Sequence, residues 1–183
     1  EGPNADDWRP IHLTLAQWED GFTDSERLQW VQNYRGFRLP MDDNGGITAN
    51  YYNEYFKAAA WDGSGNRTYG FGRDTIDGQD ANYISSNDPY EGFAIRTTPV
   101  GYYDGSNQSG FQTRANANLY GIFDLCGNVA EIVNDYNNPV QGQYRTRGGS
   151  YIDGTSAVDV NDTHYINNGE NQYSGFRVMT TFP

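Results

Sequence analysis

Residues 63–112 consist almost entirely of turn-forming residues, and this stretch most limits the folds open to the chain. Gly, Asn, Asp and Ser occur at nearly every step, between a few aromatic anchors such as Tyr69, Phe71, Phe93 and Tyr102. These residue types favour turns over regular elements. A segment this long without regular structure is uncommon inside a domain and is usually functional. The sequence therefore predicts an irregular, loop-rich fold.

The composition supports this prediction, because aromatic residues supply most of the apolar surface. The chain of 183 residues holds Gly 22, Tyr 15 and Trp 4 but only Met 2 and Cys 1, and its mean hydropathy is -0.83. This aromatic content argues against disorder, and the length suits one domain with a real core. We expect a flexible lead-in at residues 1–10 and a single domain over residues 11–183.

The net charge of -12 argues against a nucleic-acid partner and against an anionic membrane surface, since both need clustered Lys and Arg. No apolar run is long enough to insert into a bilayer. The sequence begins at Glu1 and has no signal-peptide pattern, which indicates trimming and gives no compartment. The spread acidic residues serve solubility, or some of them hold a hard cation.

Sulfur and histidine counts exclude several kinds of site. Cys126 is the only cysteine, so the chain has neither an internal disulfide framework nor a multi-cysteine zinc site. His12 and His164 are the only histidines, so a three-histidine metal centre is also excluded. We interpret Cys126 as a small buried apolar residue rather than a nucleophile.

Local patterns predict a mixed α+β domain. We expect a strand at residues 11–15, a helix at residues 26–34 capped by Asp24 or Ser25, and a second amphipathic helix at residues 49–61. Residues 132–133, 144–147 and 176–180 have strand character. The region between the last two, residues 151–174, is polar and rich in Tyr, Asn, Asp, Ser and Gly.

Residues 118–131, which we call the central stretch, pack apolar residues between glycines and then place oxygen-bearing side chains at Asp124, Asn128 and Glu131. This stretch is one of five short sequence motifs, here called words, that occur together in a fixed order. The words are Phe37-Arg38-Leu39-Pro40, Thr98-Pro99-Val100-Gly101, the central stretch, Arg147-Gly148-Gly149-Ser150 and Gly175-Phe176-Arg177-Val178.

In this order the five words resemble domains of the formylglycine-generating-enzyme (sulfatase-modifying factor) type, from about residue 11 onward. The resemblance implies a C-type lectin-like α+β fold with two helices, short antiparallel strands and much irregular loop. The chain departs from the family in two respects. The usual first strands are missing upstream, and Ala130 and Ile132 stand where tryptophans are usual.

The catalytic chemistry of such domains does not carry over. The oxidase resembles this chain in its frame, but it needs two cysteines after the Arg-Gly-Gly-Ser word to bind copper. Residues 151–156 contain no sulfur, and hydroxyl or carboxylate groups do not replace soft copper(I) ligands. The related sulfoxide synthases need three histidines for iron. We therefore expect no catalytic residues.

Calcium binding is the family property that the residues of this chain can still support, and we expect the ion to have a structural role. The family's ion site implies the side chains of Asp124 and Glu131 with the carbonyls of Gly127 and Val129, a hard oxygen set suited to calcium. A second family site implies the Asn82 side chain, the Tyr83 carbonyl, the Glu91 side chain and the Phe93 carbonyl. Alternatively, Asp124 and Glu131 only hydrogen-bond to backbone in a tight turn.

Residues 151–174, the display segment, occupy the place of the variable region in diversity-generating retroelement variable proteins, which share this fold. Its composition is also that of an antibody paratope, in which Tyr gives contact area and small polar residues adapt. Only Glu170 and Gln172 fall outside the residue types that adenine randomisation of AAY codons produces. The candidate ligand-binding residues are Tyr151, Asp153, Thr155, Ser156, Asp159, Asn161, Asp162, His164, Tyr165, Asn167, Asn168, Asn171 and Tyr173.

Three functions remain open from the sequence. The first is a non-catalytic display protein on a phage, virus or cell surface, which binds a protein or glycan ligand through exposed Tyr and Asn side chains of residues 151–173. The second is a non-catalytic accessory member of the family, with that segment buried against a partner. The third is an enzyme of the family with altered chemistry, which would require an unrecognised cluster of ligands in a cleft. Oligomerisation also stays open, since a shortened first strand leaves a sheet edge to cover.

Overall fold

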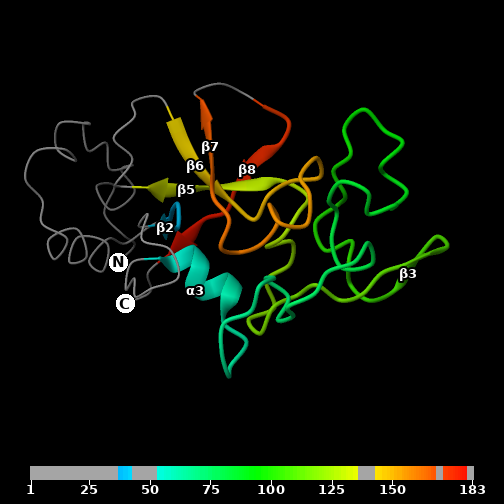
Figure 1. Ribbon diagram of the computed structural model, residues 1–183, viewed down its shortest axis with the longest axis horizontal. Helices are drawn as coiled ribbons and strands as arrows, with labels where there is room; N and C mark the ends of the chain where they lie inside the picture. The colour runs from blue at the N-terminus through cyan, green and yellow to red at the C-terminus, as the bar shows by residue number, and fades with distance from the viewer. Residues whose placement is uncertain (1–36, 43–52, 136–142, 168–170, 181–183) are drawn as a thin grey trace, which may run out of the picture.

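The computed structural model describes residues 37–42, 53–135, 143–167 and 171–180. Within them lie one helix and nine short strands (Figure 1). They are β1 (Phe37–Arg38), β2 (Met41–Asp42), α3 (Glu54–Ala60), β3 (Asn107–Gln108), β4 (Phe111–Gln112), β5 (Ala130–Asp135), β6 (Gln143–Arg147), β7 (His164–Asn167), β8 (Ser174–Phe176) and β9 (Met179–Thr180). The expected lead-in at residues 1–10, strand at 11–15 and helix at 26–34 all lie outside the described residues.

The central sheet is mixed rather than purely antiparallel. Its strands follow the order β2-β5-β6-β7, and β8 pairs with β5 as well. The β5-β6 and β6-β7 pairs are antiparallel, whereas β2 and β8 both run parallel to β5. The expectation of antiparallel strands was therefore wrong for β2 and β8. Both reach β5 through long connections, which permit the parallel direction that a hairpin does not.

The helix α3 is shorter than the pattern at residues 49–61 predicts. Asn53 caps it, since its Oδ1 accepts a hydrogen bond from the Phe56 N–H at 2.7 Å. The helix ends at Ala60, and Trp61 has an extended backbone. Its buried face carries Tyr55, Ala59 and Ala60. Residues 49–52 lie outside the described part of the chain.

The core uses aromatic rings and small residues, as the composition predicts. The irregular segments at residues 63–106 and 113–129 pack against α3 and β5 through this core, and the green loops extend to one side of the sheet in Figure 1. Its main members are Tyr55, Tyr69, Phe71, Tyr83, Leu125, Cys126, Val133, Val158 and Val160. The predicted irregular region, all of which the structure describes, contains the small β3-β4 hairpin and isolated bridges at Asn66 and between Tyr69 and Arg73, and no other strand pairing.

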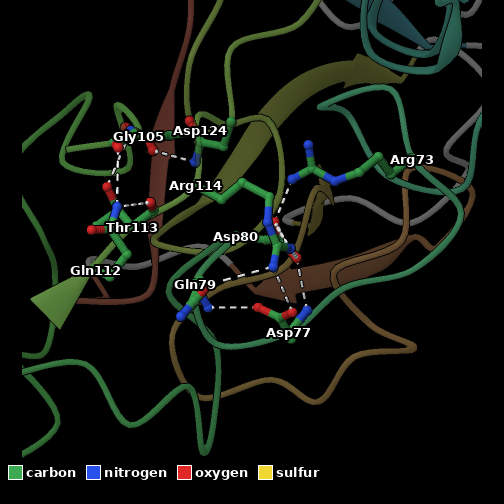
Figure 2. A network of polar contacts seen from close by, with 10 residues as sticks. Arg73, Asp77, Gln79, Asp80, Gly105, Gln112, Thr113, Arg114 and Asp124 are labelled. Carbon is green, nitrogen blue, oxygen red and sulfur yellow. Dashed lines mark hydrogen bonds and ion pairs between the residues drawn. The ribbon is translucent and has the colours of Figure 1, made fainter. Parts of the chain in front are cut away.

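A polar network fixes the irregular half of the molecule (Figure 2). Asp80 is almost fully buried, and Arg114 Nη1 donates to its two carboxylate oxygens at 2.6 and 2.8 Å. Arg73 pairs with the same carboxylate, and Arg114 also reaches Asp77. The network joins residues 73–80 to residues 105–116. Ion pairs therefore replace regular backbone ladders in holding these loops.

The expected last strand at residues 176–180 is split. β8 follows β5 to Phe176, whereas β9 begins at Met179 and pairs with β1. Between them Arg177 turns its guanidinium inward, where Nη2 donates to the Phe123 carbonyl at 2.9 Å. No helix in the described residues is long and apolar enough to cross a membrane.

Candidate functional site

Asn128 connects the central stretch to three other segments. Its Oδ1 accepts from the Thr98 N–H at 3.0 Å, and its Nδ2 donates to the Thr98 carbonyl at 3.2 Å. Its backbone N–H donates to the Asn82 carbonyl at 2.7 Å, and its carbonyl accepts from the Tyr151 N–H at 3.1 Å. The Asn128 side chain thus satisfies the buried N–H and C=O groups of Thr98, which have no neighbouring strand to bond to.

Two glycines let the Arg-Gly-Gly-Ser word approach the central stretch closely. The Gly127 N–H donates to the Gly148 carbonyl at 2.7 Å, and both glycines have positive φ, +74° and +79°. A Cβ on Gly127 would lie 2.2 Å from the Asn82 carbonyl oxygen, and one on Gly148 would lie 2.7 Å from the Leu125 carbonyl oxygen. Neither position accepts a side chain without displacing backbone.

Arg147 ties the display segment to the sheet. Its Nη2 donates to Asp42 Oδ1 at 2.8 Å, and both side chains are buried. Its Nη1 donates to the Asn161 carbonyl at 3.1 Å. One guanidinium, at the end of β6, therefore holds both β2 and the middle of the display segment. This arrangement gives the display segment a rigid base.

The first candidate calcium set lies beside an arginine. Asp124 Oδ2 accepts from the Gly101 N–H at 2.9 Å and Oδ1 from Asn116 Nδ2 at 3.1 Å, while Glu131 Oε1 accepts from Arg177 Nε at 2.8 Å. Burial raises the pKa of Glu131, and the charge of Arg177 opposes that rise. Glu131 Oε2 and Asn116 Oδ1 are buried acceptors that no described donor satisfies.

Acceptors without donors are groups that a cation would satisfy, so this set fits a hard ion. The residues that the structure describes contain no cluster of three or more His, Cys, Asp or Glu side chains. A calcium ion here would therefore depend on the carbonyls of Gly127 and Val129 in addition to the two carboxylates.

The second candidate calcium set is less compact. Asn82 Nδ2 donates to the Arg96 carbonyl at 2.6 Å, and the Tyr83 carbonyl accepts from the Ser86 N–H at 3.0 Å. Glu91 Oε1 is buried and has no described donor. Phe93 is 60% exposed and packs on Tyr90. Within the described contacts, nothing joins Asn82 to Glu91 or Phe93.

A pocket of about 470 Å³ opens over the sheet beside the display segment. Ala130, Thr146 and Ser150 contribute from the frame, and four consecutive residues of β7 contribute from the display segment. Ile152 and Ser174, near the two ends of the display segment, also line it. Six of the predicted ligand-binding residues line this pocket: Asp153, His164, Tyr165, Asn167, Asn171 and Tyr173.

The other predicted ligand-binding residues lie elsewhere. Thr155 and Ser156 are exposed, while Asp159, Asn161 and Asp162 are half-buried in turns. Asn168 lies outside the described residues. The expectation of an exposed Tyr151 was wrong, because its side chain is 2% exposed and packs edge-on against Tyr173, with ring centroids 5.7 Å apart. Tyr151 directly follows the buried Ser150, so it belongs to the frame.

Charged groups on the pocket wall are compensated within the protein. The Asp153 carboxylate accepts from the Ser150 N–H at 2.8 Å and from its hydroxyl at 2.7 Å. His164 Nε2 lies 2.6 Å from Asp162 Oδ2. The Tyr165 hydroxyl accepts from Arg145, whose guanidinium also lies 5.1 Å from the Tyr165 ring centroid. These groups therefore shape the pocket rather than offer it an unpaired charge.

Two amides leave donors for a ligand. Asn171 Oδ1 accepts from the Tyr173 N–H at 2.9 Å, and Asn167 Oδ1 accepts from Gln143 Nε2 at 3.2 Å. Within the described residues, neither Nδ2 group has an acceptor. Uncharged donors beside tyrosine rings are the type of lining that recognises polar ligand groups.

Sequence reasoning missed several residues of this site. Thr146, Ile152 and Ser174 line the pocket although none was predicted to do so. Ile152 is apolar and so falls outside a polar paratope pattern. Arg177 lies in the Gly175-Phe176-Arg177-Val178 motif. The alternation of apolar and polar residues along a strand does not reveal that its side chain pairs with Glu131, because that contact depends on tertiary structure.

Comparisons with known proteins agree with this geometry. Two solved structures share the fold. Treponema denticola variable protein 1 is 22% identical with a TM-score of 0.53, over 80% of this chain and 48% of that chain. The protein titled "Crystal Structure of CarF" is 24% identical with a TM-score of 0.55, over 82% of this chain and 49% of that one. The chain thus spans about half the length of each.

No curated protein matches the sequence. The family model of the sulfatase-modifying factor enzyme 1-like domain matches residues 51–182, which include the central stretch, the Arg-Gly-Gly-Ser word and the display segment. The family resemblance in the sequence is thereby confirmed. The chain belongs to the family of sulfatase-modifying factor enzyme 1-like domains.

Proposed function

We propose that this chain is a non-catalytic ligand-binding display protein of the diversity-generating retroelement type. The observation that carries the proposal is the pocket, since six of the residues that the sequence predicts to bind ligand line it together. The frame below that pocket is buried and bonded through Asn128, Arg147 and two constrained glycines. A rigid base under an exposed polar surface is what a display scaffold requires.

The state of the sole cysteine supports a non-catalytic role. Cys126 is buried, its Sγ accepts from the Gly70 N–H at 3.1 Å, and burial raises the pKa of its thiol to about 12. A thiol in this state is neither a nucleophile nor a metal ligand at neutral pH. Residues 151–156, where the oxidase needs its copper ligands, offer oxygen and apolar side chains instead.

The fold shared with a protein titled as a variable protein supports the retroelement interpretation. On this proposal the side chains divide in two classes. Buried residues such as Tyr151, Val158 and Val160 keep the frame and stay constant. Exposed residues such as Tyr165, Asn167 and Asn171 vary and select the ligand, at the surface of a phage, virus or cell.

We also propose that calcium supports the frame at Asp124 and Glu131, with the Gly127 and Val129 carbonyls. The buried, unsatisfied Glu131 Oε2 supports this site. The ion would hold the central stretch against β5 and would not contact the ligand. The set at Asn82, Tyr83, Glu91 and Phe93 is a second proposal, supported only by the buried Glu91 Oε1.

Randomising the pocket tests the display function. In one library the codons for Asp153, His164, Tyr165, Asn167, Asn171 and Tyr173 are replaced with adenine-randomised AAY codons. A matched library randomises six buried frame residues: Tyr151, Val158, Val160, Thr146, Arg147 and Ser150. We expect most clones of the first library to fold and to yield binders against an arbitrary protein such as lysozyme. The second library should mostly fail to fold.

If the pocket library fails to fold as often as the frame library, the display proposal is wrong. That result would favour an accessory protein whose display segment serves a fixed structural role. Folding is read from resistance to proteolysis, and binding from enrichment over successive selection rounds.

A further inference from the structure

Arg96 differs from every other arginine that the structure describes. Seven of these arginines form ion pairs, namely Arg38, Arg67, Arg73, Arg114, Arg145, Arg147 and Arg177. The guanidinium of Arg96 has neither an ion pair nor a hydrogen bond within the described residues, although its side chain is half-buried. In a chain with a net charge of -12, an arginine without an acidic partner is unexpected.

The backbone of Arg96 is held in the frame of the display pocket. Its carbonyl accepts from Asn82 Nδ2 at 2.6 Å. The Asn82 carbonyl accepts from the Asn128 N–H at 2.7 Å, and the Asn128 carbonyl accepts from the Tyr151 N–H at 3.1 Å. Three successive hydrogen bonds thus connect Arg96 to the residue that begins the display segment.

Tyr151 provides a second observation at the same place. Its side chain is only 2% exposed, and its buried hydroxyl has no hydrogen-bond partner among the described residues. Its ring packs on Tyr173, which lines the pocket. Burial raises the pKa of Tyr151, the neighbouring Tyr173 adds to the rise, and the charge of Arg96 opposes it. The charge of Arg96 therefore reaches Tyr151, which packs behind the pocket-lining Tyr173.

We propose that Arg96 binds a carboxylate of the displayed pocket's ligand, and that this carboxylate is an Asp or Glu side chain of a partner protein. The inference rests on the proposed display function. A guanidinium donates two parallel hydrogen bonds to a carboxylate, which suits this group better than a neutral one. Arginine and tyrosine are among the residue types that dominate the free energy of protein–protein binding.

The charge of the whole chain restricts the partner further. An acidic protein would be repelled by the net charge of -12 before it reached Arg96. The partner is therefore neutral or basic overall and has one exposed carboxylate at the contact. A protein is favoured over an acidic glycan because the Tyr and Asn lining of the pocket matches a paratope.

The stability of a variant separates this binding role from a structural one. Among the described residues, Arg96→Gln removes no ion pair or side-chain hydrogen bond, so its Tm should stay within about 2 °C of the wild-type value. Arg67→Gln is the matched control, with the same loss of charge at a residue paired with Asp62. A fall of more than about 5 °C for Arg96→Gln would assign it a structural role and overturn the proposal.

The binding test selects a random heptapeptide library on the immobilised wild-type, Arg96→Gln and Arg67→Gln chains. We expect Asp and Glu to be enriched over the input on the wild-type and Arg67→Gln chains, but not on Arg96→Gln. The best peptide should bind Arg96→Gln about tenfold or more weakly. Replacing its acidic residue with the amide should weaken binding to the wild-type and Arg67→Gln chains but not to Arg96→Gln.

The contrary results can be told apart. Peptides that lack acidic enrichment, yet are lost in Asn171→Ala, would overturn the role of Arg96 and leave the display function intact. Binding only to glycans that bear sialic or uronic acid, tested on the same chains, would overturn the protein partner. Absence of binding to both probes would contradict the display function itself and the inference with it.

Discussion

Arg147 on β6 and Asp42 on β2 form a buried ion pair although the two residues lie 105 positions apart in the chain. The pair holds the Arg-Gly-Gly-Ser word beneath the display segment, because the same guanidinium also donates to the Asn161 carbonyl. The base of the pocket therefore depends on one long-range contact that neither local segment provides.

Replacing Arg147 with Met should destabilise the protein by about 3–5 kcal/mol, because it leaves the Asp42 carboxylate buried without its main partner. The double variant Asp42→Leu/Arg147→Met should recover a large part of this loss, since it removes the uncompensated charge. Denaturant unfolding of the two single variants and the double variant measures the coupling. A cost below about 1 kcal/mol for Arg147→Met would show that the pair is not structural.

Gly127 and Gly121 provide a matched pair for backbone constraint. Both have φ near +75°, but only Gly127 lies against backbone, since a Cβ on Gly121 meets nothing within 4 Å. Gly121→Ala should cost about 1 kcal/mol through backbone strain alone. Gly127→Ala should cost about 3 kcal/mol or more, because the Asn82 carbonyl has to move. Equal unfolding free energies for the two variants would contradict the close approach at Gly127.

The pair of Arg177 and Glu131 makes stability depend on pH. Burial already raises the pKa of Glu131, and Arg177 opposes the rise. Arg177→Gln should raise this pKa further, so the charged carboxylate becomes more costly in the folded state. When the pH falls through this raised pKa, Glu131 becomes protonated in the folded variant, and the stability that the buried charge had cost is regained. The Tm deficit of Arg177→Gln should thus be larger at pH 7.5 than at pH 5, and a deficit independent of pH would refute this account.

Calcium should stabilise the frame if Asp124 and Glu131 hold an ion. Thermal melts in EDTA and in millimolar calcium should differ in midpoint, with the higher Tm in calcium. Asp124→Asn should remove the part of the difference that comes from the first set, whereas Glu91→Gln should remove only the part that comes from the second set. A midpoint that calcium leaves unchanged would remove both proposed sites.

Short motifs made the family recognisable, because each motif adopts a backbone conformation or makes a close backbone contact that only particular residues allow. Gly127, Gly148 and Asn128 have positive φ at close backbone contacts, so few other residues fit there. The aromatic core, the buried Cys126 and the irregular region also followed from residue types alone. These are local or compositional properties, and the sequence displays them directly.

Long-range relationships could not be predicted in the same way. The parallel direction of β8 beside β5 and the break between β8 and β9 depend on where the chain returns after the display segment. Tyr151 is of a residue type that is common in binding surfaces, but it is buried, because the hydrogen bond to Asn128 fixes its backbone. The unpaired Arg96 became visible only when the partners of the other described arginines were known.

Sequencing this gene from many related isolates, together with the DNA beside it, tests the central claim most directly. The display account predicts substitutions confined to adenine positions of the codons for pocket residues such as His164, Tyr165, Asn167 and Asn171. Arg147, Gly148 and the buried Tyr151 should be constant, and a near-identical template repeat should lie next to the gene. Substitutions spread evenly over frame and pocket, with no template repeat, would contradict the account.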